Sequence, residues 1–131
     1  MNAHTQTVTI QANPKVVFDF VANIENLPKW ALVFCQRLRR EGSRWIVTTP
    51  GGKLTIRYAT DPKSGVVDMY TSAAGSAEDA AYSRVIPNGN GSEYVFTFFQ
   101  APDISDDDFA RQGQALKKEL GVLKGLLEAQ R

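Results

Sequence analysis

Charged and aromatic side chains share strand-like stretches in the middle of the chain, and these residues have the greatest potential for chemistry. A turn centred near Lys63 would pair two strands and place Arg57 opposite Asp68. Residues opposite each other on antiparallel strands point to the same face of the sheet, so Tyr70 would share this face. A buried charge is costly unless it is paired. We therefore predict an Arg57–Asp68 ion pair if this face points inward.

A second hairpin, with its turn centred near Gly89, would collect aromatic side chains on one face. This register places Arg84 opposite Tyr94 and Tyr82 opposite Phe96. Facing inward, these residues would form an aromatic wall that carries one spare cation. Arg84 would then be available to a carboxylate or a carbonyl group of a ligand.

Two other arrangements fit the same residues. Arg57, Asp68 and Arg84 could face solvent, where an ion pair contributes little to stability. Alternatively, a shift of one residue in the last hairpin would reverse the assignment and turn Val95, Thr97 and Phe99 inward, because the side-chain period of a strand is two. The sequence leaves these arrangements open.

Two helical positions complete the candidate site. Trp30 lies in a short predicted helix and either gates a pocket or fills the core. Gly113 interrupts an apolar helical stripe, where glycine costs about 1 kcal/mol relative to alanine. A close approach of the sheet, or space for a ligand, would account for it. The predicted ligand-binding residues are Trp30, Arg57, Asp68, Tyr70, Tyr82, Arg84, Tyr94, Phe96, Phe98, Gly113 and Leu116.

The composition excludes several kinds of functional site. Cys35 is the only cysteine, which excludes an intrachain disulfide and a zinc site built from cysteines. His4 is the only histidine and falls in a terminus that we expect to be frayed, so a catalytic triad or a multi-histidine metal site is excluded. We predict no metal and no cofactor, and the catalytic residues of any reaction are unknown.

A cluster of arginines surrounds Trp45 but does not make the protein basic. Arg37, Arg39, Arg40 and Arg44 could contact phosphates beside a stacking platform. The formal net charge is only +1, however, which disfavours nucleic acid as a partner. An edge hairpin protected by charge against pairing with other strands is the favoured interpretation.

The order of the predicted elements is strand, helix, short helix, six strands and a long helix, within one domain spanning residues 1–131. Asn13-Pro14 is a typical helix start, and a turn with a short helix follows at 25–31. Clusters of Gly, Pro, Asn and Ser separate the strands, and such short connectors favour antiparallel neighbours. The predicted strands are 5–10, Cys35–Glu41, Arg44–Thr49, Leu54–Thr60, Val66–Thr71, Glu78–Ile86 and Glu93–Gln100.

The terminal helix is predicted over 105–129. Ser105 can cap it, and Asp108 completes a pattern similar to a capping box. The apolar stripe that includes Leu116 and Leu120 would be buried, while Lys117 would be exposed. A coiled coil could give the same stripe, but the sheet before it needs a cover. We therefore predict an α+β fold with a curved, seven-stranded antiparallel sheet around this helix.

The N-terminal stretch MNAHTQTVTIQANP lacks a basic segment followed by an apolar run, so it does not resemble a secretory signal. The longest apolar runs are also too short to span a bilayer. The expected location is the cytoplasm, without a membrane span.

Several stretches together resemble the helix-grip fold of the START/Bet v 1-like (SRPBCC) superfamily, in particular its small members similar to polyketide cyclases and dehydrases. This resemblance implies a hydrophobic ligand pocket between the curved sheet and the terminal helix. It also leads us to expect a histidine directly after GVVD, where this chain has Met69. The stretches are LPKWALVF (27–34), TPGGKLTIRYA (49–59), GVVD (65–68), SRVIPNGNGSEYVFTFFQ (83–100) and LKKELGVLKGLLE (116–128).

Three functions remain open from the sequence. The leading hypothesis is binding of a small apolar or aromatic ligand, through an apolar pocket with a few polar anchors. A cyclase or dehydrase would need a positioned acid or base, with Asp68 beside Arg57, Arg84 or a tyrosine phenol such as Tyr70, Tyr82 or Tyr94 as candidates. The third is an interaction protein that uses a sheet edge or the terminal helix, and a homodimer is compatible with all three.

Overall fold

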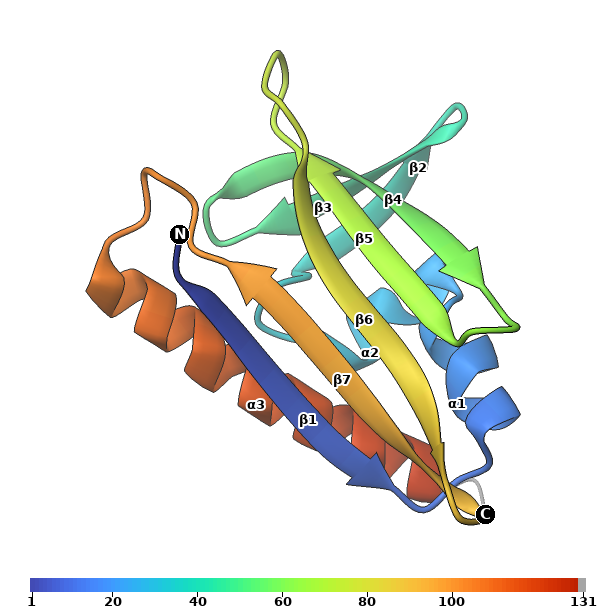
Figure 1. The fold of residues 1–131 in the computed structure, drawn as a ribbon. Helices are drawn as coiled ribbons and strands as arrows, with labels where there is room; N and C mark the ends of the chain where they lie inside the picture. Colours follow the sequence, from blue (N-terminus) through green and yellow to red (C-terminus); the bar gives the residue numbers. More distant parts are fainter. Residues whose placement is uncertain (130–131) are drawn as a thin grey trace.

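The computed structural model describes residues 1–129, which form one curved antiparallel sheet with helices on its concave side (Figure 1). The strand order is β1-β7-β6-β5-β4-β3-β2. This confirms the predicted fold class. The elements are β1 Ala3–Ile10, α1 Pro14–Val21, the 3-10 helix η1 Ile24–Asn26, α2 Leu27–Trp30, β2 Arg37–Glu41, β3 Arg44–Thr49, β4 Gly52–Asp61, β5 Val66–Ser72, β6 Asp79–Asn88, β7 Gly91–Phe99 and α3 Asp106–Glu128.

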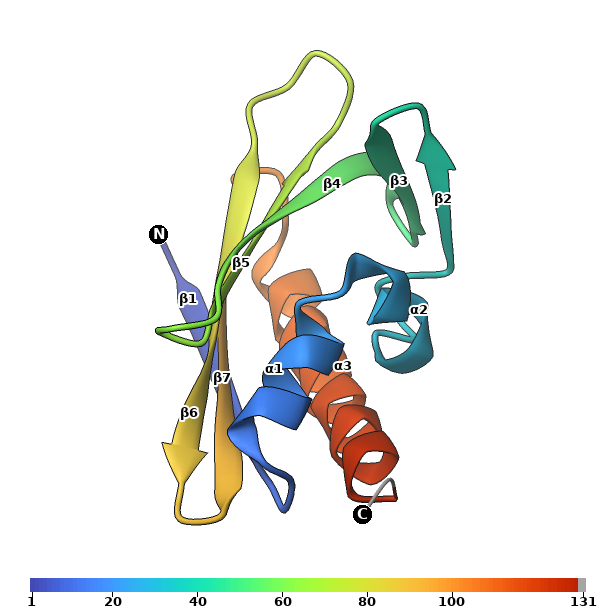
Figure 2. The same ribbon diagram turned by 90° about the vertical axis from the view of Figure 1, so that its right-hand side faces the viewer.

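The first helix begins where the sequence predicts it. Asn13 accepts a hydrogen bond from the backbone N–H of Lys15 at 2.8 Å, and Pro14 occupies the first turn. Asn23 caps η1 in the same way, through the N–H of Glu25. These caps satisfy amides that a helix start leaves without a partner. Helices α1 and α2 lie on the concave side of the sheet, as Figure 2 shows.

Helix α3 covers the sheet along β1 and also packs against α2. The Ser105 side chain accepts a hydrogen bond from the Asp108 N–H at 3.1 Å, which confirms the predicted cap. Leu116 and Leu120 are buried in the core, whereas Lys117 is exposed. The apolar stripe is therefore covered by the chain's own sheet, and a coiled coil is not needed to explain it.

The sheet bends strongly at β4, so that β2 and β3 fold over α2 (Figure 2). The last β4 residue paired with β3 is Ile56, opposite Trp45. Strand β4 then continues to Asp61, paired only with β5. Beyond Ile56, β4 therefore has no neighbouring strand on that side, and this local feature shapes the candidate site.

The predicted register of both central hairpins is wrong. Arg57 lies opposite Tyr70 rather than Asp68, a shift of two residues that keeps all three on one face. In the last hairpin, Arg84 lies opposite Val95, a shift of one residue. Because one residue changes the face, Arg84 points to the convex side of the sheet while the even-numbered residues of β7 point inward.

The turn between β6 and β7 explains the one-residue shift. Asn88 pairs with Gly91, so Gly89 and Asn90 alone connect the strands. Gly89 has a φ of 58°, which suits the first position of a two-residue hairpin turn. The sequence PNGNG contains two glycines, and its composition alone did not decide the centre of the turn.

In the part of the chain that the structure describes, no helix combines the length and the apolar character needed to cross a membrane.

Candidate ligand-binding site

The structure divides the predicted site residues between the two faces of the sheet. Six of them lie on the concave side or on α3, and five lie on the convex side. The concave set is Trp30, Tyr94, Phe96, Phe98, Gly113 and Leu116, and the convex set is Arg57, Asp68, Tyr70, Tyr82 and Arg84.

The concave set forms a packed interior. The ring of Trp30 meets Tyr94 edge to face, with the centroids 6.4 Å apart, and both side chains are buried. The Tyr94 hydroxyl donates to Ser83 Oγ at 2.9 Å, and Ser83 donates to the Val67 carbonyl at 2.6 Å. Burial raises the pKa of the Tyr94 phenol well above its usual value. Tyr94 is therefore a neutral core residue whose hydroxyl is satisfied internally.

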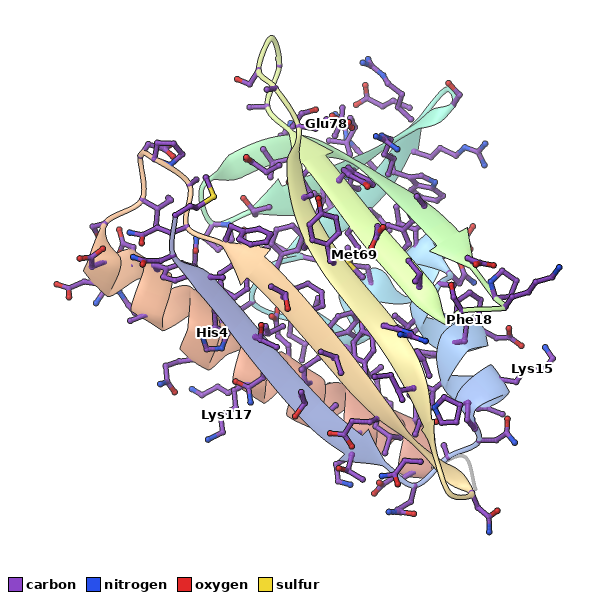
Figure 3. The ribbon with its side chains drawn as sticks, viewed as in Figure 1. His4, Lys15, Phe18, Met69, Glu78 and Lys117 are labelled. Carbon is purple, nitrogen blue, oxygen red and sulfur yellow. The ribbon has the colours of Figure 1, made fainter. Side chains whose placement is uncertain are left out.

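Gly113 makes room for His4, the single histidine. A Cβ atom at position 113 would lie 2.8 Å from the His4 ring, closer than side chains pack. His4 also contacts Phe98, with ring centroids 5.5 Å apart (Figure 3). Of the two explanations offered by the sequence, close approach of sheet and helix is therefore the one observed. The expected fraying at His4 is wrong, because this residue belongs to β1.

The convex residues do not form the predicted ion pair. Asp68 lies opposite Ala59 on β4, and the partner of Arg57 is Glu78, just before β6. Arg84 donates from Nε to the Ser64 carbonyl at 2.9 Å, which ties β6 to the β4–β5 turn.

A groove of about 510 Å³ opens beside β4, where β3 has no residues left to pair with it. Its apolar lining residues include the buried Ile56, and we call this apolar part the floor. The exposed charged residues Arg57 and Glu78 form the part that we call the rim. Figure 2 shows α1 and α2 below the bend of β4. We call this feature the side groove, and its lining residues are Ala22, Ile24, Ser43, Arg44, Trp45, Thr55, Ile56, Arg57, Tyr58, Tyr70 and Glu78.

Tyr58 both lines the side groove and packs against the buried core. Its ring is half-buried, and burial raises the pKa of its phenol well above the ordinary value, with smaller contributions from Tyr94 and Cys35. The Tyr58 hydroxyl forms no hydrogen bond to another residue within 1–129. It therefore offers a neutral hydrogen-bonding group at the edge of the groove.

Arg57 and Glu78 form the charged part of the rim. Nε and Nη2 of Arg57 donate to the two Glu78 carboxylate oxygens, each at 2.7 Å. The guanidinium carbon lies 4.2 Å from the centre of the Tyr70 ring. The hydrogen bonds from Arg57 hold the pKa of the Glu78 carboxyl below its usual range.

The arginine cluster of β2 and β3 lies at the edge of the sheet, as the favoured interpretation predicts. Arg39 forms an ion pair with Glu41, and the Arg40 guanidinium lies over the Trp45 ring at 5.6 Å. Arg44 contributes to the side groove.

Glu119 is a buried residue that sequence reasoning missed. Its Oε2 accepts hydrogen bonds from the Val33 and Phe34 backbone N–H groups, at 3.1 and 2.9 Å. Desolvation raises the pKa of this carboxyl, and the two amide hydrogen bonds oppose that shift. Glu119 directly precedes the buried Leu120 and lies at the edge of the apolar stripe of α3. This position in the helical pattern was the signal that could have identified it.

We expect Glu119→Ala to lower the free energy of unfolding by about 1–3 kcal/mol, because two amides lose their acceptor. Glu119→Gln retains an acceptor and is the matched control, with an expected cost below about 1 kcal/mol. Chemical denaturation of both variants measures the difference. Equal costs would contradict the role assigned to this carboxylate.

The pH dependence of the same variants has a defined sign. A carboxyl with a raised pKa binds its proton more tightly in the folded state, so wild-type stability should fall as pH rises through the folded pKa. Glu119→Gln has no titrating carboxyl at this position. Its free energy of unfolding should therefore fall less between the unfolded and the folded pKa of Glu119.

Together these features define the class of protein: a helix-grip domain, whose curved seven-stranded antiparallel sheet closes on a long C-terminal helix. Residues 1–128 match the family described as polyketide cyclase / dehydrase and lipid transport, and the chain belongs to this family. Among curated proteins, none matches the sequence.

Solved structures share the fold at low sequence identity. The Aha1 dimer from Colwellia psychrerythraea is 17% identical, with 98% of this chain and 97% of that chain covered and a TM-score of 0.75. Ara h 8.0201 is also 17% identical, with 98% of both chains covered and a TM-score of 0.66. DynU16, a protein of the dynemicin biosynthetic locus, is 14% identical, with 100% of this chain and 49% of that chain covered and a TM-score of 0.72.

Proposed function

We propose that this protein binds a small, largely apolar or aromatic molecule in the side groove. The observation that carries the proposal is a groove of about 510 Å³ that is lined by both apolar and polar side chains. Small-molecule sites have this size and this division between an apolar body and a few polar groups. Family membership supports the same kind of function, because its description includes lipid transport.

The floor provides the apolar contacts. Trp45 and Ile56 are cross-strand neighbours, and Ile24 faces them from η1. An aromatic ligand placed there would lose water-exposed surface, which is the main favourable contribution to binding. Of the ligand-binding residues predicted from the sequence, Arg57 and Tyr70 line the side groove. We propose that the concave set packs behind Tyr58 and supports the groove without contacting the ligand.

A binding role is preferred to catalysis because of the charges at the groove. Glu78 is the only carboxylate among the described lining residues, and its pKa is lowered by Arg57. Such a carboxylate is a poor proton acceptor near neutral pH. The phenol of Tyr58, with its raised pKa, is a poor proton donor there.

The test uses 2-naphthamide, a neutral aromatic probe, and follows the Trp45 indole N–H cross-peak by NMR. The Trp45→Phe variant assigns this peak, and the peak of the buried Trp30 serves as an internal reference. We expect saturable movement of the Trp45 peak and a thermal stabilisation that rises with probe concentration.

Ile24→Gln should weaken binding of 2-naphthamide about fivefold, because a polar group replaces part of the apolar floor. Val16→Gln is the matched control, since Val16 is an exposed apolar residue of α1 outside the groove lining. Equal effects of the two variants, or a Trp45 peak that does not respond, would refute the proposed site.

A further inference from the structure

Arg57 already binds a carboxylate through two parallel hydrogen bonds. Its Nε and Nη2 atoms each lie 2.7 Å from a different carboxylate oxygen of Glu78. Bidentate pairing of this kind is the geometry by which arginine recognises planar carboxylates specifically. The Tyr70 ring lies against the guanidinium, with the guanidinium carbon 4.2 Å from its centre, and Tyr70 is the direct cross-strand partner of Arg57. The sheet therefore orients the guanidinium.

The two partners are anchored differently. Arg57 belongs to β4 and is flanked by paired strand residues, whereas Glu78 belongs to the connection between β5 and β6 (Figure 3). That connection is exposed from Ala73 onward and turns at Gly75, which has a φ of 76°. The ion pair is itself exposed, with 58% of the Arg57 side chain and 41% of the Glu78 side chain accessible. A ligand carboxylate that replaces Glu78 would form the same kind of exposed pair with Arg57, so the exchange itself costs little.

The charges of the side groove favour an anion once Glu78 has moved. Arg44, Arg57 and Glu78 are the charged residues among its described lining. With the Glu78 carboxylate displaced, two guanidinium groups would stand at the rim of an apolar floor. A ligand with an aromatic or aliphatic body and one carboxylate matches this distribution.

We propose that Arg57 recognises the carboxylate of an apolar organic acid bound in the side groove, and that the Glu78 carboxylate occupies this position in the absence of ligand. This inference rests on the proposed function and specifies its ligand class. The ligand carboxylate exchanges with Glu78 on a guanidinium that Tyr70 keeps in place. The body of the ligand passes around the free edge of β4 to Trp45 and Ile56, which line the groove from the opposite face. No covalent step is involved.

The experiment compares 2-naphthoate with 2-naphthamide, which share the ring system and differ in charge. Dissociation constants are measured at low salt from the Trp45 indole cross-peak for the wild type, Glu78→Gln and Arg57→Gln. Removing the internal competitor in Glu78→Gln should tighten 2-naphthoate about two- to fivefold. Arg57→Gln should weaken 2-naphthoate about fivefold or more. Binding of 2-naphthamide should change in the same direction but by a smaller factor than binding of 2-naphthoate in each variant, because the neutral amide carries no carboxylate to exchange with Glu78.

Arg57→Lys separates charge from geometry. Lysine retains the positive charge but lacks the planar fork, so this variant should recover only part of the affinity for 2-naphthoate. Asp108→Asn and Arg111→Gln are matched controls, because these two residues form another exposed arginine–carboxylate pair, at 2.9 Å on α3, outside the groove lining. They should leave binding of both probes unchanged.

The two probes distinguish failure of this inference from failure of the proposed function. If 2-naphthamide binds and 2-naphthoate is unaffected by Glu78→Gln and Arg57→Gln, carboxylate recognition by Arg57 is refuted while the groove remains a binding site. If neither probe moves the Trp45 peak, both proposals fail. If Glu78→Gln lowered the dissociation constants of both probes equally, Glu78 would act by steric hindrance. The proposed exchange between Glu78 and the ligand carboxylate would then be refuted.

Discussion

Gly65→Ala is expected to destabilise the protein by about 3–5 kcal/mol, or to prevent its accumulation as a folded protein. Gly65 has a φ of 77° and is buried at the end of the β4–β5 turn. A Cβ atom there would lie 2.2 Å from the Val85 carbonyl oxygen, which is backbone and cannot move independently of β6. The Gly65 carbonyl also accepts a hydrogen bond from the Val85 N–H at 2.9 Å. The substitution would force the turn away from β6 and break this contact.

Gly89→Ala is the matched control for this prediction. Gly89 also has a positive φ, 58°, but a Cβ atom there would meet no atom within 4 Å. It should therefore show only the cost of the left-handed conformation, about 1–2 kcal/mol. Urea denaturation of both variants measures the difference. If the free energies of unfolding of Gly65→Ala and Gly89→Ala differed by less than about half a kcal/mol, the close approach of Gly65 to Val85 would not have the expected effect on stability.

Leu120→Ala is expected to cost about 2–5 kcal/mol of unfolding free energy. The Leu120 side chain is only 1% exposed and lies within the stripe by which α3 packs on the sheet. Truncation removes buried methyl groups and leaves a cavity that the surrounding core fills only in part. Alanine is a good helix former, so the loss would arise from packing rather than from helix propensity.

Lys117→Ala provides the comparison on the same helix. Lys117 is exposed, and Figure 3 shows its side chain directed away from the sheet. Its substitution should change stability by less than about half a kcal/mol. Chemical denaturation that showed a similarly small loss for Leu120→Ala would contradict the assignment of the buried face.

The candidate site was only partly predictable from the sequence. Arg57 and Tyr70 were predicted together on one face, because the two-residue shift of their hairpin preserves that face. Ile56 and Tyr58 were not predicted, although they alternate with Arg57 along β4 and face the other side. The groove includes both faces because β4 loses its neighbour after Ile56 and the lining passes around its free edge.

The ion-pair partner of Arg57 could not be predicted from local sequence patterns. Glu78 lies 21 residues away, at the end of a connection whose path no periodicity specifies. Asp68 was the natural candidate from the hairpin alone. The observed pairing depends on how the β5–β6 connection returns over the sheet, which is a long-range property.

The sequence by itself determined the order of the elements, the caps of α1 and α3, the buried stripe of α3 and the family resemblance. These features follow from local rules: capping chemistry at Asn13 and Ser105, and helical periodicity that places Leu116 and Leu120 on one face. Only the tertiary structure decided the direction of Arg84, the partner of Arg57 and the location of the side groove. A one-residue difference at the Gly89 turn reverses a face of a strand, and the groove arises where two strands of unequal length separate, so neither depends on local composition alone.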